Sequence, residues 1–342
     1  MNRYFFIKIL LLLGLIEAST PLNLHISYHS GYDNNVMRFS GKEIEHAGEN
    51  KDMMGGASTF DSYINKINTR LQKSIFVRGK NELNMSSSFN LSSYAHNPNK
   101  SYWSGNFIMT YKWGSYRNIR YSARHLNSYY LRHYIDRDVS TNNLRPCYFT
   151  DRDQTVNLTM PIKNRLWYSL EAGYLQRYYD NTFTEFDLDI YYARIKLNKR
   201  IKKFGTISLQ FDRGFAKNIS YNKTAVSSDF DRSYESLEWY LPIKFDRSLS
   251  YFSQVGFSFR QEIRLYDAEA LDDALHSGRN HKDLKLDIWI GRKINDRLEI
   301  TISSRFRKRD TDSSYDWVRD LKSFNQMQLW CKIKWGFTYD NY

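Results

Sequence analysis

Histidines are the residues in this sequence whose type best suits acid–base chemistry. His25 and His29 have the same parity in one stretch of alternating apolar and polar residues, and His125 and His133 lie near the end of another. Nucleophilic or acid–base catalysis needs such a group close to a nucleophile and an orienting acid. The sequence contains neither Gly-x-Ser-x-Gly nor His-Glu-x-x-His, the motifs that would supply these partners. It therefore predicts no catalytic residue and no enzyme.

Pairs of acidic residues are candidates for a cation site, because carboxylate oxygens are the ligands that Ca²⁺ prefers. Asp187 and Asp189 are two residues apart and share one side of an expected strand. Three further pairs fall in expected loops: Asp136/Asp138, Asp229/Asp231 and Asp272/Asp273. None of these pairs has the spacing of a calcium loop. Two cysteines, Cys147 in an expected loop and Cys331 in an expected strand, are too few for a thiolate zinc site. The sequence predicts no metal and no cofactor.

Charged residues give the stronger signal, because two groups of opposite sign occupy different stretches of the chain. The acidic group consists of Glu171, Glu185, Asp187, Asp189, Asp212 and Glu238. The basic group consists of Lys66, Arg70, Arg120, Arg124, Arg305, Arg307, Lys332 and Lys334. On opposite walls of a water-filled lumen, these groups would set up a transverse field that favours polar and charged solutes. Two other interpretations stay open: salt-bridged filling of a closed lumen, and binding of acidic sugars by the arginines.

Strands must position these side chains, because apolar and polar residues alternate along most of the chain. Leu83, Met85, Phe89 and Leu91 share one parity, for example, with polar residues between them. Fourteen such segments are expected, at 21–31, 58–72, 81–95, 101–114, 117–132, 151–163, 165–178, 183–198, 204–216, 232–245, 249–265, 281–292, 297–309 and 321–338. This number of strands, within a range of 12 to 16, is even, as a barrel that crosses the outer membrane requires.

The connections between these segments alternate between short turns and longer loops, as in bacterial outer-membrane barrels. Short turns are centred near residues 79, 115, 164, 202, 247 and 295. Two of the longer loops, 32–57 and the helix-like stretch 266–276, are candidate constrictions. An open sheet edge in lipid would leave backbone groups unpaired, so the sheet must close. The sequence predicts an all-β fold, a transmembrane antiparallel up-and-down β-barrel of about 14 strands.

A soluble β-sandwich also shows alternation, and aromatic residues at both strand ends distinguish the two. Aromatic side chains gather at the two interfaces of a membrane barrel. One expected girdle contains Trp113, Tyr168, Phe245, Tyr251 and Trp335, and the other contains Phe60, Tyr174, Phe186, Phe259 and Phe324. Arg3 and Lys8 precede the apolar run 9–16 and the small residues Ala18 and Ser19, so residues 1–18 are expected to be a signal peptide and 19–342 a single barrel domain.

Composition excludes several other classes of protein. The 342 residues include 27 Tyr, 21 Phe and 8 Trp but only 5 Pro and 16 Gly, which argues against a disordered or collagen-like chain. No apolar run reaches the length of about 20 residues that a spanning helix needs. The net charge of +13 suits nucleic acid, but the basic residues are spread over expected lumen, turns and loops of an exported chain. No nucleic-acid partner is therefore expected.

The first expected strand and its exit carry a resemblance to known barrels. In Leu22–Val36, the step Tyr32-Asp33-x-Asn35-Val36 resembles the opening strand of the barrel domain of surface lipoprotein assembly modifiers and of barrels associated with exopolysaccharide loci. The first of these resemblances implies a fourteen-stranded barrel. Only the architecture is carried over, because the expected strands begin directly after the signal peptide, without the helical-repeat domain of the lipoprotein modifiers. Tyr32, Asp33 and Asn35 are otherwise interpreted as a girdle aromatic and turn-forming side chains.

These patterns favour a porin-like channel in the outer membrane of a Gram-negative bacterium, for passive diffusion of small polar or charged solutes. The alternative is a plugged barrel that serves export or assembly of polysaccharide or surface lipoprotein, and an outer-membrane enzyme comes third. The expected partners are the solutes, outer-membrane lipid and lipopolysaccharide. The phosphates of lipopolysaccharide would meet the loop residues Arg132, Arg137, Arg279 and Lys282.

Overall fold

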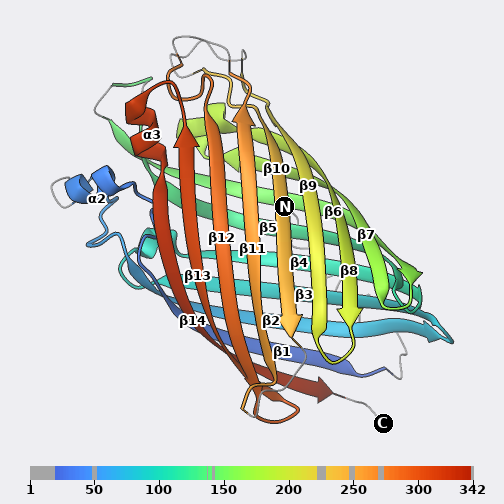
Figure 1. Cartoon of the computed structure of the whole chain (residues 1–342). Coiled ribbons are helices and arrows are strands. Elements are labelled where there is room, and N and C mark those ends of the chain that lie inside the picture. The colour runs from blue at the N-terminus through green and yellow to red at the C-terminus, as the bar shows by residue number, and fades with distance from the viewer. Residues whose placement is uncertain are drawn as a thin grey trace, which may run out of the picture.

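Fourteen antiparallel strands form one closed ring in the computed structural model of this chain (Figure 1). The structure describes residues 20–47, 52–136, 138–140, 143–221, 229–245, 251–268 and 273–339. The expected signal peptide, 1–18, lies outside the described residues. The strands are β1 (Leu22–Asp33), β2 (Ser62–Arg78), β3 (Asn81–Tyr94), β4 (Tyr102–Gly114), β5 (Arg117–Ile135), β6 (Leu144–Lys163), β7 (Leu166–Tyr179), β8 (Leu188–Ile201), β9 (Gly205–Asn218), β10 (Tyr234–Phe245), β11 (Gln254–Tyr266), β12 (Asn280–Lys293), β13 (Leu298–Asp312) and β14 (Phe324–Tyr339).

The first and last strands close the ring. β1 pairs with β14 along its whole length, from Leu22 opposite Tyr339 to Asp33 opposite Gln328. The same strand pairs with β2 on its other side, from Leu22 opposite Lys73 to Asp33 opposite Ser62. Every strand thus has two neighbours and no sheet edge is open, which is the condition for a sheet to lie in lipid. The predicted fold class and strand number are confirmed.

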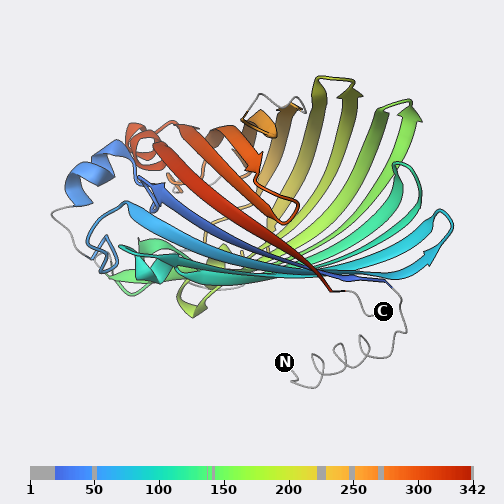
Figure 2. The ribbon, with the colours of Figure 1, turned by 90° about the horizontal axis from the view of Figure 1, so that it is seen from below.

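Connections at the two ends of the barrel differ in length, as the sequence predicted. One end carries the short turns 79–80, 115–116, 164–165, 202–204 and 294–297. The other end carries the longer connections, and with them the short helices α2 (Gly41–Ala47), η1 (Pro98–Lys100), η2 (Asn181–Phe186) and α3 (Asp316–Lys322). In Figures 1 and 2, α2 and α3 lie at the same end, away from the end of β14 at the C-terminus. Within the described residues, no helix has the length and apolar character needed to cross a membrane.

Several strand boundaries differ from the predicted ones. At the end with the short turns, β2 continues to Arg78 instead of residue 72, and β11 begins at Gln254 instead of residue 249. The other differences lie at the end with the long connections. β6 begins at Leu144 instead of residue 151, because it extends alongside a β5 that continues to Ile135. β8 begins at Leu188 instead of residue 183, since residues 181–186 form η2. β14 begins at Phe324 because α3 occupies the residues before it. The predicted helical stretch 266–276 is wrong in its described part: Tyr266 ends β11 and residues 274–278 form turns.

Large apolar side chains cover the outside of the ring. Ile67, Phe89, Tyr191, Ile288 and Leu329, from five different strands, are between 50% and 61% exposed. On each strand they alternate with polar residues, which therefore face the interior. In water such a continuous apolar surface would drive association, whereas in a bilayer it contacts lipid.

Three of the expected girdle aromatics face the interior instead. Phe324 is 5% exposed and lies under the guanidinium groups of Arg307 and Arg309. Phe60 packs against a buried cluster at the mouth, and Phe186 lies in η2. The sequence pattern failed at these positions because all three fall at or beyond a strand end, where parity no longer reports the direction of the side chain.

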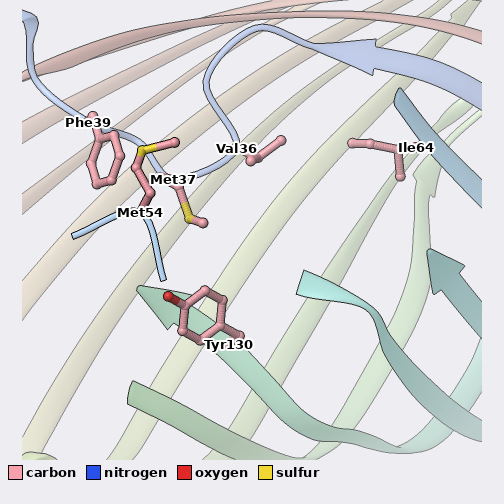
Figure 3. Close-up of a cluster of buried hydrophobic side chains, with 6 residues drawn as sticks. All are labelled: Val36, Met37, Phe39, Met54, Ile64 and Tyr130. Carbon is pink, nitrogen blue, oxygen red and sulfur yellow. The ribbon is translucent and has the colours of Figure 1, made fainter. Parts of the chain in front are cut away.

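The segment between β1 and β2 folds over the interior at the end with the long connections. Its residues Val36, Met37, Phe39 and Met54 form a buried cluster with Ile64 of β2 and Tyr130 of β5 (Figure 3). Asn35, part of the step that carried the resemblance, fixes the start of this segment. Its side-chain amide donates to the carbonyls of Phe39 and Asn325, at 2.8 and 3.0 Å. The described part of this segment packs against strand residues at this end of the barrel, and a constriction by 32–57 stays a prediction.

Gly205, at the turn between β8 and β9, offers a test of that turn. Gly205 has φ +145°, and a Cβ there would meet the carbonyl oxygen of Lys244 on β10. Gly205→Ala should therefore lower the free energy of unfolding by about 1–3 kcal/mol, since backbone cannot yield as a side chain can. The matched control is Gly105→Ala in β4, where a Cβ meets nothing within 4 Å. Urea unfolding of the refolded barrels, followed by tryptophan fluorescence, measures both; equal midpoints would contradict this account of the turn.

Candidate functional site

The eight basic residues singled out in the sequence all have interior-facing parity. Lys66 and Arg70 alternate with the exposed Ile67 and Leu71 on β2, and Lys332 and Lys334 alternate with outward residues of β14. The others are Arg120 and Arg124 on β5 and Arg305 and Arg307 on β13.

Only three of the six acidic residues have interior-facing strand positions. These are Glu171 on β7, Asp212 on β9 and Glu238 on β10. Asp189 shares its parity with the exposed Tyr191 and Ile195, so its predicted lumen-facing position is wrong. Glu185 and Asp187 are not on a strand at all, because Glu185 lies within η2 and Asp187 directly follows it. The expected acidic run along β8 therefore does not exist: its interior positions carry Leu188, Ile190, Tyr192, Arg194 and Lys196.

The remaining acids line a cavity of about 480 Å³, the inner cavity, within the wall from β4 to β11. Five arginines line it together with five carboxylates. Arg194 bridges Glu171 at 2.5 Å and Asp212 at 2.8 Å, and Arg124 lies 3.3 Å from Asp153. These pairs neutralise what the sequence suggested to be a purely acidic wall.

The arginines of β13 are neutralised in the same way by β12. Arg305 contacts Asp287 at 2.6 Å. Arg307 and Arg309 share the carboxylate of Asp283, at 2.5 and 2.8 Å. A transverse field between the two predicted groups is therefore largely cancelled within each wall.

One part of the interior keeps an excess of positive charge, where β14, β1 and β2 adjoin. In register, His29 lies between Lys332 and Lys66, and His25 lies opposite Arg70. Lys334 is one step from Lys332 on the same face. We call the set Lys66, Arg70, Lys332 and Lys334, with His25 and His29, the basic tract. Among the described residues, no carboxylate lies within 4.0 Å of its four lysine and arginine side chains. Lys66 instead lies over the Trp330 ring, 4.3 Å from its centroid.

A second cavity, of about 510 Å³, lies at the end with the long connections, and we call it the outer cavity. It is lined by residues of α2, β5, β6, η2, the 267–279 connection and α3. Arg177, Tyr234 and Arg264 line both cavities, so the two adjoin. Arg177 is held by Asp151 through two hydrogen bonds of 2.9 Å.

The sequence reasoning missed the interior partners Asp151, Arg177, Arg194 and Asp283. The two-residue turn 164–165 sets the register beside Lys163, but a β-bulge between Pro161 and Lys163 shifts it by one residue. Counting from the turn would place Arg177 opposite Arg152 and not opposite Asp151, so the local sequence carried no signal for this pair. None exists across the long connections either. Cys147 was also misplaced: it lies in β6 and is fully buried, while Cys331 is exposed, and both thiols are free.

The candidate cation and phosphate ligands have other roles in the structure. Asp136 accepts a hydrogen bond from the amide of Asp138, and Asp231 from that of Ser233, as turn-forming side chains do. Within the described residues, no three His, Cys, Asp or Glu side chains are grouped to hold a metal ion. Arg132 and Arg279, expected at the lipopolysaccharide surface, instead line the outer cavity. Asp272 and Arg137 lie outside the described residues.

Comparison with known proteins finds no match among family models and none among curated sequences. Solved structures match over nearly the whole chain. OprD from Pseudomonas aeruginosa is 9% identical, with a TM-score of 0.43 and 94% of each chain covered. The anion-selective porin from Comamonas acidovorans is 10% identical, with a TM-score of 0.42 and 93% of this chain and 99% of that chain covered. For a loop-deletion mutant of OmpT from Vibrio cholerae, the identity is 7%, the TM-score 0.46 and the coverage 94% and 100%.

With TM-scores below 0.5, the class of this protein rests on its own geometry. The closed ring, the apolar exterior and the charged interior are those of an outer-membrane β-barrel of porin-like architecture.

The carboxylate that two arginines share provides a test of the interior charge network. Asp283→Asn should lower the free energy of unfolding by about 3 kcal/mol, because Arg307 and Arg309 would be left buried without a counter-charge. Asp310→Asn, at an exposed position of β13, is the matched control and should be neutral. Urea unfolding in detergent checks both; a stable Asp283→Asn variant would show that the pair does not hold the wall together.

Proposed function

We propose that this protein is an outer-membrane channel through which small polar or charged solutes diffuse passively, with a preference for anions. The observation that carries the preference is the basic tract, four cationic side chains that face the interior and have no carboxylate within 4.0 Å in the part of the chain that the structure describes. The proposal includes export to the periplasm by the signal peptide and contact of the outer surface with membrane lipid and lipopolysaccharide.

The positive field of the basic tract is not cancelled from the opposite wall of the barrel. In the ring, β8 lies seven strands from β1 in either direction, so the inner cavity and the basic tract face one another. The cavity wall is balanced in charge, whereas the tract is not. Low-dielectric walls focus the field of such uncompensated charges along a water-filled lumen and raise the local concentration of anions.

The cations of the tract are spread along the strands, which would let a bound anion leave. In register with β1, they lie opposite His25, Ser27 and His29 instead of converging on one point. A series of weak sites lets an ion enter without being trapped, which conduction requires.

A plugged barrel that serves export or assembly is the second candidate function. The packing of the 34–61 segment against Ile64 and Tyr130 supports it, since this segment occupies part of the mouth. Such a barrel would conduct only when a partner displaces the segment.

Single-channel recording separates these two functions. In a planar bilayer with a salt gradient, the refolded barrel should show stable open steps and a reversal potential of the sign that anion selectivity gives. Replacing Lys66, Lys332 and Lys334 together by glutamine should lower the anion-to-cation permeability ratio several-fold, since three lumen charges are removed.

The matched control replaces three outward-facing lysines, Lys199, Lys217 and Lys308, by glutamine. It should leave the reversal potential unchanged, because these side chains do not face the lumen. Heat-modifiable migration in a gel confirms that each variant is folded. A folded wild-type barrel that conducts nothing would overturn the channel and favour the plugged alternative.

A further inference from the structure

The outer cavity has more positive charge than its own residues neutralise. Its cationic side chains are Arg132, Arg177, Arg232, Arg264, Arg279, Arg309 and Lys322, against the acids Glu43 and Glu185. Four of these cations have carboxylate partners: Arg132 pairs with Glu43, Arg177 with Asp151, Arg264 with Glu262, and Arg309 with Asp283. Among the described residues, Arg279 and Lys322 have no carboxylate within 4.0 Å.

Arg279 is the cation of this cavity whose charge its described surroundings balance least. The residue is only 5% exposed, and one of its terminal nitrogens donates to the carbonyl of Leu275 at 2.7 Å. Its guanidinium carbon lies 3.9 Å from the centroid of the Tyr266 ring, which orients the group. Its Nε is buried without a hydrogen-bond acceptor. A buried guanidinium with an unsatisfied donor and no counter-charge costs free energy that a bound anion would recover.

Lys322, on α3, lines the same cavity, near Arg279. Burial, together with the nearby positive charges of Arg132 and Arg279, lowers the pKa of this amine to about 7. An anion between Lys322 and Arg279 would favour the charged amine, because it adds the negative charge that the cavity lacks.

Much of the rest of the lining is apolar or aromatic, which restricts the kind of anion. Leu188 is 6% exposed and adjoins Phe186 and Tyr179, while Trp317 and Leu321 come from α3. A small inorganic anion would leave this surface without a partner. The volume of about 510 Å³ lies within the range of small-molecule sites.

We propose that the outer cavity binds a small amphipathic carboxylate, with its charged end between Arg279 and Lys322 and its aromatic or aliphatic body against the wall of Phe186, Leu188 and Tyr179. The inference names the solute class of the proposed channel and rests on that function. The cavity lies at the end of the barrel with the long connections and adjoins the inner cavity, as an entry site requires.

Direct binding to the full-length barrel in detergent tests this site. Isothermal titration with sodium benzoate, at constant ionic strength and pH 6, should show saturable binding. Sodium acetate has the same charge without the ring, and benzamide has the ring without the charge, so both should bind about tenfold more weakly or worse. Equal binding of benzamide and benzoate would overturn the inference.

Variants locate the binding. Arg279→Gln and Lys322→Gln should each weaken benzoate binding about tenfold, the loss expected for one charge-assisted hydrogen bond. The matched control Lys308→Gln lies beside Arg309 on β13 but faces outward, and it should bind as the wild type does. Because Arg279 also contacts Leu275 and Tyr266, heat modifiability checks its fold, and Lys322→Gln gives an independent test. Unchanged affinity in both folded variants would overturn the site.

The pH dependence of benzoate binding tests whether the charge of Lys322 takes part, which a merely structural role of Lys322 would not require. Lys322 is faced by Arg132 and Tyr134 of β5, Glu43 of α2, Arg279 of the 267–279 connection, and His281 and Arg309 of β12 and β13. With a pKa of about 7, it is mostly charged at pH 6 and mostly neutral at pH 8.5. Benzoate, ionised at both, should bind more tightly at pH 6, and Lys322→Gln should lose most of this difference. The pKa of His276, lowered to about 4 by burial, keeps that ring out of the titration.

Conductance of the same preparations separates this inference from the channel. Anion-selective conductance without saturable benzoate binding would overturn the carboxylate site and leave the channel intact. Binding by a folded barrel that never conducts would support the site and overturn the channel.

Discussion

The backbone of a chain in lipid has no water with which to pair, and the rest of this structure follows from that constraint. The pairing of β1 with β14, from Leu22 opposite Tyr339 to Asp33 opposite Gln328, satisfies the last two rows of backbone donors and acceptors. Closure also divides the side chains into two sets. Outward positions in the membrane are mostly apolar, so most of the charge that the strands carry there is directed to the interior. The barrel thus concentrates charge in a confined space, and the arrangement of that charge decides what the interior can admit.

Most of the interior charge is neutralised locally, within one wall or between adjacent strands. Arg194 with Glu171 and Asp212 is one example, and Asp283 with its two arginines is another. Removing one partner of such a buried group is costly, so these networks stabilise a particular arrangement of strands. They contribute little net field. Selectivity is left to the few places where the balance is incomplete, namely the basic tract and the surroundings of Arg279.

The sequence predicted the barrel well because alternation along a strand needs no knowledge of its neighbours. The fourteen strands and the inward direction of the eight basic residues follow from parity, and the breaks in the alternation locate the short turns, apart from the one near residue 247, which lies outside the described residues. Parity fails where a strand ends: Glu185 and Asp187 precede β8, where η2 stands in place of the expected strand. Asp189 lies on β8 itself but shares the parity of the outward Tyr191 and Ile195, so the row was assigned to the wrong face there. Charge pairing fails for a different reason. It depends on register, which local sequence specifies only near the short turns, whereas the outer cavity joins residues from segments as far apart in the chain as α2 and α3.

The order of the two cavities along the barrel indicates how a solute would move once it has entered. The outer cavity has uncompensated cations, while the inner cavity balances its arginines with carboxylates. Between them stand Arg177 and Arg264, whose charges Asp151 and Glu262 already neutralise. An anion would therefore be held most strongly at the mouth and more weakly farther in, where the basic tract on the opposite wall attracts it without enclosing it. Strong binding alone would block the lumen; capture at the mouth followed by weaker, spread attraction is the arrangement that permits passage.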